Sequence, residues 1–123
     1  MKRILLVEDN ELNREGLYRL FTKRGYEILQ AEDGESAVRM AINDSPDLIL
    51  MDVSIPGIDG YEATRTIRAY EAAHNLSQVP IIALTAHAML QDRLTAEEAG
   101  CTDFETKPVD IKRLAEKIEK SLI

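Results

Sequence analysis

The chain has 123 residues, 45% of them hydrophobic, which is enough to bury the core of one ordinary domain. Its 15 basic and 22 acidic residues give a net charge of −7, which argues against binding to nucleic acid or anionic lipid because both need clustered Lys and Arg. Cys101 is the only cysteine and the apolar run after Arg3 is too short for a signal peptide or a membrane span, so a cytoplasmic protein without a disulfide is expected.

The chain alternates between short apolar runs and helical stripes. Residues 4–7 are all apolar, which predicts a strand buried on both faces. A helix follows and ends at Gly25, and its apolar stripe consists of Leu17, Leu20 and Phe21. Residues 26–30 mix polar and apolar side chains, which is typical of a strand at the edge of a sheet. The next helix begins near Asp33 and stops before Pro46, because proline cannot continue a helix.

The rest of the chain continues this alternation. In order, the expected elements are a buried strand at 48–51, a helix at about 60–74, a buried strand at 81–84, a helix at about 88–99 closed by Gly100, an edge strand at 102–106 and a helix at 111–122. The helix at 111–122 has the clearest one-sided stripe: Ile111, Leu114, Ala115, Ile118 and Leu122.

A (βα)₅ alternation predicts an α/β fold with a parallel sheet and helices on both faces. With the three apolar strands in the centre and right-handed crossovers, the simplest strand order is 2-1-3-4-5, a doubly wound, flavodoxin-like topology. Because the chain leaves the first and third strands in opposite directions, a crevice should open at their carboxyl ends, where such sheets bind ligands. Since no repeat or linker interrupts the pattern before Ile123, we expect a single domain over residues 1–123 without an output domain.

Polar side chains follow four of these strands at the predicted crevice: Glu8 and Asp9, then Asp52, Thr85 and Lys107. Carboxylates ~4 Å apart repel by roughly 4 kcal/mol per pair at an effective dielectric of about 20, so a cation must lie among the three acids or one must hold a proton. Hard oxygen ligands without His or Cys favour Mg²⁺. A lysine and a threonine hydroxyl beside the acids indicate a phosphoryl group rather than a bare metal.

Several residues also have purely structural interpretations. Asp9 or Asn10 could cap the helix that follows. We interpret His74 and His87 as solvated or partner-facing rather than as phosphoacceptors or ligands, and Cys101 as a small core hydrophobe. The methionines expected to pack, rather than to form a cofactor site, are Met40, Met51 and Met89.

Five blocks of the chain match the hallmarks of a known family in order and spacing. They are LVEDN at 6–10, DLILMD at 47–52, PGIDG at 56–60, ALTA at 83–86 and KP at 107–108. On these blocks the chain resembles the receiver domains of response regulators, the CheY-like superfamily, over essentially its whole length. Three further segments resemble receivers of hybrid histidine kinases or stand-alone phosphorelay regulators: residues 8–13, 85–89 and 99–104.

The resemblance implies a Mg²⁺-dependent phosphorylation site. Asp52 would accept a phosphoryl group from a histidine kinase or a histidine phosphotransfer protein. Asp9, Asp52 and the backbone carbonyl of Ser54 would bind Mg²⁺, and Glu8 would act mainly through a water on the metal. Ser54 stands where methionine is frequent in the family.

The resemblance also implies a conformational switch. Thr85 would be the switch hydroxyl, Lys107 the cation that pairs with phosphate, and Phe104 the switch aromatic, here without the hydroxyl of the more usual tyrosine. The Lys107–Pro108 bond would be cis. A downstream protein target would contact the changed surface, formed by residues 88–99, 102–106 and 111–122.

Two other function classes fit parts of the sequence. An aspartyl-phosphate phosphatase usually has a second Asp two residues after the nucleophile, where this chain has Ser54. A receiver-like interaction module that is never phosphorylated would not need the complete acidic set with Thr85 and Lys107. The expected protein is therefore not a turnover enzyme and catalyses only its own phosphorylation and dephosphorylation.

Overall fold

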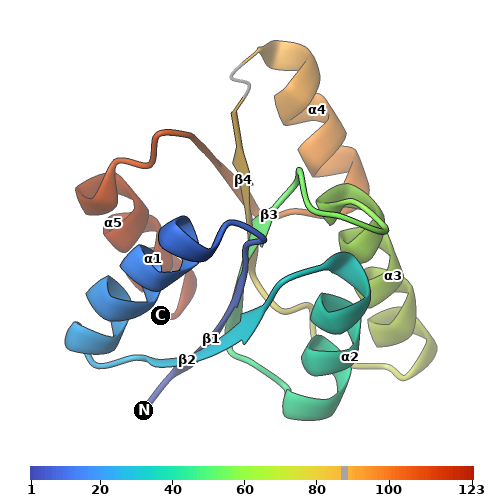
Figure 1. The fold of residues 1–123 in the computed structure, drawn as a ribbon. Coiled ribbons are helices and arrows are strands. Elements are labelled where there is room, and N and C mark those ends of the chain that lie inside the picture. The colour runs from blue at the N-terminus through green and yellow to red at the C-terminus, as the bar shows by residue number, and fades with distance from the viewer. Residues whose placement is uncertain (87–88) are drawn as a thin grey trace.

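The computed structural model describes residues 1–86 and 89–123, and within these ranges a parallel sheet lies between two layers of helices (Figure 1). The strands are β1 (Arg3–Val7), β2 (Glu27–Ala31), β3 (Leu48–Asp52), β4 (Ile81–Thr85) and β5 (Asp103–Thr106). The helices are α1 (Glu11–Lys23), α2 (Gly34–Asp44), α3 (Gly60–Ala73), α4 (Leu90–Ala99) and α5 (Ile111–Ser121). The strands pair in the order β2-β1-β3-β4-β5, which confirms the predicted doubly wound topology.

Some element boundaries differ from the prediction by a residue or two. β2 begins at Glu27 because the N–H of Tyr26 donates to the carbonyl of Phe21, which keeps Tyr26 in the turn after α1. α4 begins at Leu90, whereas the sequence indicates a start near residue 88. Residue 88 and His87, whose interpretation as partner-facing or solvated is not tested, lie outside the described residues.

The hydrophobic core lies on both faces of the sheet. On one face, Leu6 and Leu50 pack against Phe21 of α1 and Leu114 of α5. On the other, residues of β1, β3 and β4 pack against α2 and α3: Leu5, Ile49, Ile81, Ala37 and Ile67. β1, β3 and β4 are therefore buried on both faces, as their unbroken apolar runs predict. None of the helices in the described ranges is long and apolar enough to cross a membrane.

Two helix starts place backbone close to the predicted crevice. Asn10 caps α1, because its side chain accepts a hydrogen bond of 3.0 Å from the N–H of Asn13. The cap thus uses Asn10 and leaves the exposed carboxylate of Asp9 beside the crevice. At the start of α3, a Cβ on Gly60 would lie 2.5 Å from the carbonyl oxygen of Asp52, so this helix can begin against the end of β3 only with a glycine there.

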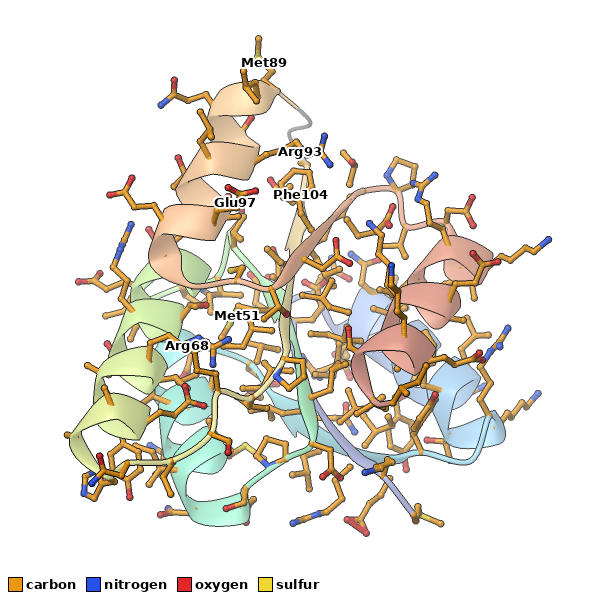
Figure 2. The ribbon with its side chains drawn as sticks, turned by 180° about the vertical axis from the view of Figure 1, so that it is seen from behind. Met51, Arg68, Met89, Arg93, Glu97 and Phe104 are labelled. Carbon is orange, nitrogen blue, oxygen red and sulfur yellow. The ribbon has the colours of Figure 1, made fainter. Side chains whose placement is uncertain are left out.

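The structure also tests the interpretations of the remaining residues. Met51 is fully buried and Met40 is partly buried, as predicted. The prediction that Met89 packs is wrong: its side chain is 74% exposed, because it lies at the amino-terminal tip of α4, which extends past the sheet (Figure 2). Cys101 is partly buried and packs against the core residues of α3 and α4, where burial raises the pKa of its thiol, in agreement with the structural interpretation. His74 ends α3 and stacks on Tyr70 with ring centroids 4.0 Å apart, away from the crevice.

Candidate functional site

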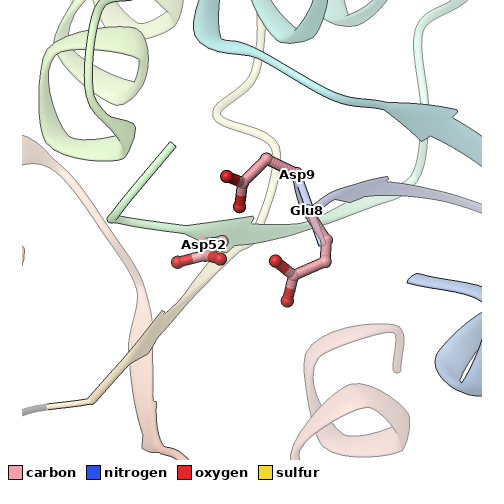
Figure 3. Close-up of side chains that lie close together, drawn as sticks. All are labelled: Glu8, Asp9 and Asp52. Carbon is pink, nitrogen blue, oxygen red and sulfur yellow. The ribbon is translucent and has the colours of Figure 1, made fainter. Parts of the chain in front are cut away.

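Three carboxylates meet at the carboxyl ends of β1 and β3. Glu8 and Asp9 follow β1 directly, and Asp52 is the last residue of the adjacent β3. One oxygen from each of the three lies within 4.8 Å of the others (Figure 3). The structure therefore brings together the acids that the sequence analysis places at this edge of the sheet.

A lysine that follows the edge strand β5 completes the cluster. The Nζ atom of Lys107, just after β5, lies 2.8 Å from Asp52 Oδ2 and 3.1 Å from Glu8 Oε1. Its backbone N–H donates to the carbonyl of Thr85 at 2.7 Å, which ties the loop after β5 to the end of β4. The Lys107–Pro108 bond is cis, as the resemblance implies.

The other predicted site residues flank Asp52. The N–H of Ser54 donates to Asp52 Oδ1 at 2.9 Å, so both carboxylate oxygens of Asp52 have a hydrogen-bond partner. Thr85 is buried at the end of β4, one residue beyond the position that pairs with Asp52. Phe104 is half-buried on β5, one strand further away, where it pairs with Ala83.

Burial and the interactions among Glu8, Asp52 and Lys107 determine which groups of the cluster are charged. Burial and the neighbouring Asp52 raise the pKa of Glu8 to about 7. Burial opposes ionisation of Asp52 as well, but hydrogen bonds from Glu8, Lys107 and the Ser54 amide outweigh it and hold the pKa of Asp52 below its usual value. The pKa of Lys107 is raised because its two carboxylate partners outweigh its own burial. The geometry therefore keeps Asp52 ionised and Lys107 charged.

The donor set fits a divalent cation with a preference for oxygen. With all groups ionised, the three carboxylates exceed the single lysine by two negative charges. Repulsion from Asp52 adds to burial in raising the pKa of Glu8, so the cluster would be stabilised by additional positive charge. Mg²⁺ usually takes one or two protein carboxylates and keeps waters or phosphate oxygens in its other positions, so a cluster of three acids with one of them exposed suits this ion.

A mostly apolar groove of about 590 Å³ lies beside the acidic cluster, between α1 and the start of α5. Glu8 and Lys107 belong to both the groove and the cluster. The remaining lining residues are Leu12, Asn13, Gly16, Leu17, Leu20, Leu84, Pro108, Val109 and Ile111. A molecule in this groove would therefore touch residues that also contact Asp52.

Comparison with known proteins identifies the family to which the chain belongs. The family model described as response regulator receiver domain matches residues 4–119. The chain belongs to this family. The receiver domain is 36% identical over 121 residues to the polar-differentiation response regulator DivK of Brucella ovis, a match that covers 98% of the chain and 96% of DivK.

Other relatives are much longer proteins. The receiver domain is 42% identical over 118 residues to the sensor protein GacS of Pseudomonas syringae pv. syringae, covering 96% of the chain but 13% of GacS. The match to the sensor histidine kinase GacS of Pseudomonas protegens likewise spans 13% of that protein. The chain is thus a receiver domain of two-component and phosphorelay systems, of the kind present in both short regulators and long sensor kinases.

Solved structures agree with this assignment. The receiver domain of the sensor histidine kinase PA1611 from Pseudomonas aeruginosa, with a magnesium ion coordinated in its active-site cleft, superposes with a TM-score of 0.88 at 40% identity, covering 98% of this chain and 97% of that one. A chain of the Saccharomyces cerevisiae co-crystal of the phosphotransfer protein Ypd1 with the receiver domain of Ssk1 gives a TM-score of 0.93 at 34% identity, covering 98% and 88%.

Sequence reasoning missed two features of this receiver domain. The first is the groove, although Leu12, Gly16 and Leu20 recur every fourth residue and so form one row along α1, with no side chain at its middle position. The second is the ion-pair network of Glu105, which is buried on β5 and paired with Arg113 and Lys117 of α5. The sequence does carry a signal for this network: Glu105 lies within an expected strand, and the basic residues Arg113 and Lys117 follow in an amphipathic helix.

Proposed function

We propose that this receiver domain is a phosphorylation switch in which Asp52 accepts a phosphoryl group from a histidine kinase or a histidine phosphotransfer protein in a Mg²⁺-dependent reaction. One observation carries the proposal. Asp52 is a buried, ionised carboxylate that contacts Lys107 and lies among two further acids. A carboxylate with a neutralising cation and room for a metal is a suitable acceptor of phosphate.

The residues that would hold Mg²⁺ are Asp9, Asp52 and the backbone carbonyl of Ser54, with Glu8 acting through a water. The excess of negative charge and the all-oxygen donor set support this assignment, as does the magnesium ion in the related PA1611 receiver. When bound, Mg²⁺ supplies positive charge to the phosphoryl oxygens. It would also offset the repulsion from Asp52, which adds to the effect of burial on the pKa of Glu8.

The residues of the chain have separate tasks in the proposed reaction. A carboxylate oxygen of Asp52 attacks the phosphorus atom in line, the P–N bond of the phosphohistidine breaks, and its electron pair returns to the imidazole. Lys107 pairs with a phosphoryl oxygen, and the hydroxyl of Thr85 donates a hydrogen bond to another. Water later attacks the phosphorus of the acyl phosphate, which releases inorganic phosphate and restores Asp52. The chain therefore catalyses only its own phosphorylation and dephosphorylation.

The phosphodonor protein, we propose, occupies the groove between α1 and α5. Its phosphohistidine must reach Asp52, and the groove shares Glu8 and Lys107 with the acidic cluster. Leu12, 83% exposed at the first turn of α1, offers an apolar anchor beside the site. The Ypd1–Ssk1 co-crystal supports a protein partner of this kind.

The output of the switch would be a changed surface on α4, β5 and α5. Charge added at Asp52 would draw Thr85 towards the phosphoryl group, Phe104 would move in response, and a downstream protein target would bind the changed surface. The half-buried position of Phe104, paired with Ala83 two residues before Thr85, supports such a coupling. We expect this signalling to take place in the cytoplasm.

The proposal is tested by incubating the protein with acetyl phosphate and recording its intact mass. We expect a phosphoryl adduct with Mg²⁺, none with EDTA, and none in Asp52→Asn. Asp44→Asn, at the far end of α2, removes the same charge and should retain the adduct. An equal adduct in Asp52→Asn would reject the role of Asp52. Absence of any adduct would favour an interaction module, and sustained hydrolysis of phosphoesters would favour a phosphatase.

A further inference from the structure

Phe104 is packed between the sheet and α4. It joins a small hydrophobic cluster with Val53, which follows Asp52 directly, and with Ala83 and Ala96. On the solvent side, Cζ of Arg93 from α4 lies 5.7 Å from the centroid of the Phe104 ring (Figure 2). This distance is within the range of a cation–π interaction. The ring thus has apolar contacts on its inner side and a guanidinium group near its outer side.

The backbone of Phe104 is held separately from its ring. Nζ of Lys117 on α5 donates to the Phe104 carbonyl and also pairs with the neighbouring Asp103 and Glu105, at 3.5 and 3.0 Å. Next to the ring is a cavity of about 100 Å³, lined by Arg93, Ala96, Glu97, Cys101, Thr102, Asp103 and Phe104. The ring of Phe104 therefore has free space beside it, while its backbone is held in place. A conformational change at Phe104 would move the ring and affect its contact with Arg93.

We propose that Arg93 is a positioning residue that holds the ring of Phe104 in the conformation of the unphosphorylated protein. This inference depends on the proposed function, because Phe104 acts as a switch only if Asp52 is phosphorylated. A contact present in one conformation and lost in the other shifts the equilibrium towards the first. Removal of Arg93 should therefore raise the population of the activated conformation.

Release of Arg93 would also change the surface that a target protein meets. Arg93 is exposed on α4 between Leu90 and Leu94, whose side chains are 71% and 51% exposed. While it contacts Phe104, its charge is directed towards β5 (Figure 2). When the ring turns away, the guanidinium becomes available beside these leucines. Phosphorylation would thus present a positive charge next to an apolar strip.

The test compares Arg93→Met, which retains the length and apolar contact of the side chain, with Arg93→Lys, which retains the charge. Gln91→Ala, on the exposed side of the same helix, is the control. The first measurement is the NMR signal of the Phe104 ring without Mg²⁺ or phosphodonor, which does not require phosphorylation. We expect the signal to move in Arg93→Met towards its position in the beryllofluoride-treated wild type, to move less in Arg93→Lys, and to stay in place in Gln91→Ala.

The second measurement is the rate of phosphoryl uptake from acetyl phosphate. An exposed cation–π contact corresponds to a change of roughly two- to fivefold in population, so uptake should be faster by about that factor in Arg93→Met. The acceleration should disappear in a Phe104→Leu background, which has no ring for Arg93 to cover. An unchanged or slower rate in Arg93→Met, or the same acceleration in Phe104→Leu, would overturn the role of Arg93. Failure of the proposed function would look different, because even the wild type would then take up no phosphate.

Discussion

The ammonium group of Lys107 lies 2.8 Å from Asp52 Oδ2, although the two residues are 55 positions apart in the chain. Parallel strand pairing creates this contact, because β3, β4 and β5 all end at the same edge of the sheet. The short ion pair places a positive charge where the phosphoryl oxygens of a phosphorylated Asp52 would lie.

Replacement of Lys107 by methionine should slow phosphoryl uptake from acetyl phosphate by on the order of 100-fold, as expected for loss of one group that stabilises developing charge. Mg²⁺ should still bind, because Lys107 is not among its proposed ligands. Lys112→Met, an exposed position on α5, is the matched control. Stopped-flow or quench-flow measurement of adduct formation checks this, and an uptake rate equal to the wild type would show that Lys107 serves only to pair the acids.

Glu8→Gln should make the Mg²⁺-free protein more stable. Glu8 is 1% exposed and lies against Asp52, so its carboxylate adds repulsion and a desolvation cost that the neutral amide avoids. We expect the free energy of unfolding in urea, with EDTA present, to rise by about 1 kcal/mol, an amount reduced from the Coulomb estimate by Lys107 and by solvent. Glu116→Gln, exposed on α5, should change it little. Saturating Mg²⁺ should erase the advantage of Glu8→Gln, and a destabilised variant in EDTA would contradict the charge argument.

Leu12 allows docking to be separated from chemistry. In Leu12→Ser we expect phosphotransfer from a protein donor to require roughly tenfold more donor, the loss typical of one apolar anchor at an interface. Uptake from acetyl phosphate, which needs no docking, should be unchanged. Leu76→Ser, at the other end of the molecule and 53% exposed, should affect neither donor. Equal effects of Leu12→Ser on both donors would mean that the substitution disturbs the acidic cluster rather than a docking surface.

The network around Glu105 predicts a loss of stability in acid. Although burial opposes ionisation, hydrogen bonds from Arg113 and Lys117 lower the pKa of Glu105 below its ordinary value of 4.5. A carboxyl group whose pKa is lower in the folded state adds stability above 4.5 and loses it as the pH falls through the folded pKa. Glu105→Gln should therefore lower the free energy of unfolding by about 1–2 kcal/mol at neutral pH. This is less than the loss of a fully buried ion pair, because Arg113 and Lys117 are both partly accessible to solvent.

Urea titrations of the wild type and Glu105→Gln at several pH values test this dependence. The two unfolding curves should converge in strong acid, where Glu105 is protonated in both the folded and the unfolded wild type. A difference that persists unchanged in strong acid would show that Glu105 stabilises the fold by packing rather than by its charge.

Much of the fold and of the acidic cluster could be predicted because both follow from local patterns. The apolar tetrads of β1, β3 and β4 identify buried parallel strands, and parallel strands bring Glu8, Asp9 and Asp52 to one edge. To predict a cluster of this kind, one needs to know only the strand order and the residues at the carboxyl end of each strand. Its members therefore appear in the sequence as acidic residues directly after apolar runs.

The remaining features depend on contacts that no local pattern encodes. Arg93 reaches Phe104 only because α4 packs beside β5, and the groove at Leu12 exists only because α5 returns beside α1. The apolar character of Met89 predicts packing, yet its side chain is 74% exposed because it lies where α4 extends beyond the sheet. Tertiary placement, rather than residue type, determines these outcomes.

The measurement that tests the central claim most directly is the location of the phosphoryl group. Borohydride reduces an aspartyl phosphate to homoserine, so protein treated with Mg²⁺ and acetyl phosphate, then reduced and digested, should contain homoserine at position 52 and at no other aspartate. Homoserine at Asp9, or a phosphoryl group on His74 with Asp52 unmodified, would contradict the account.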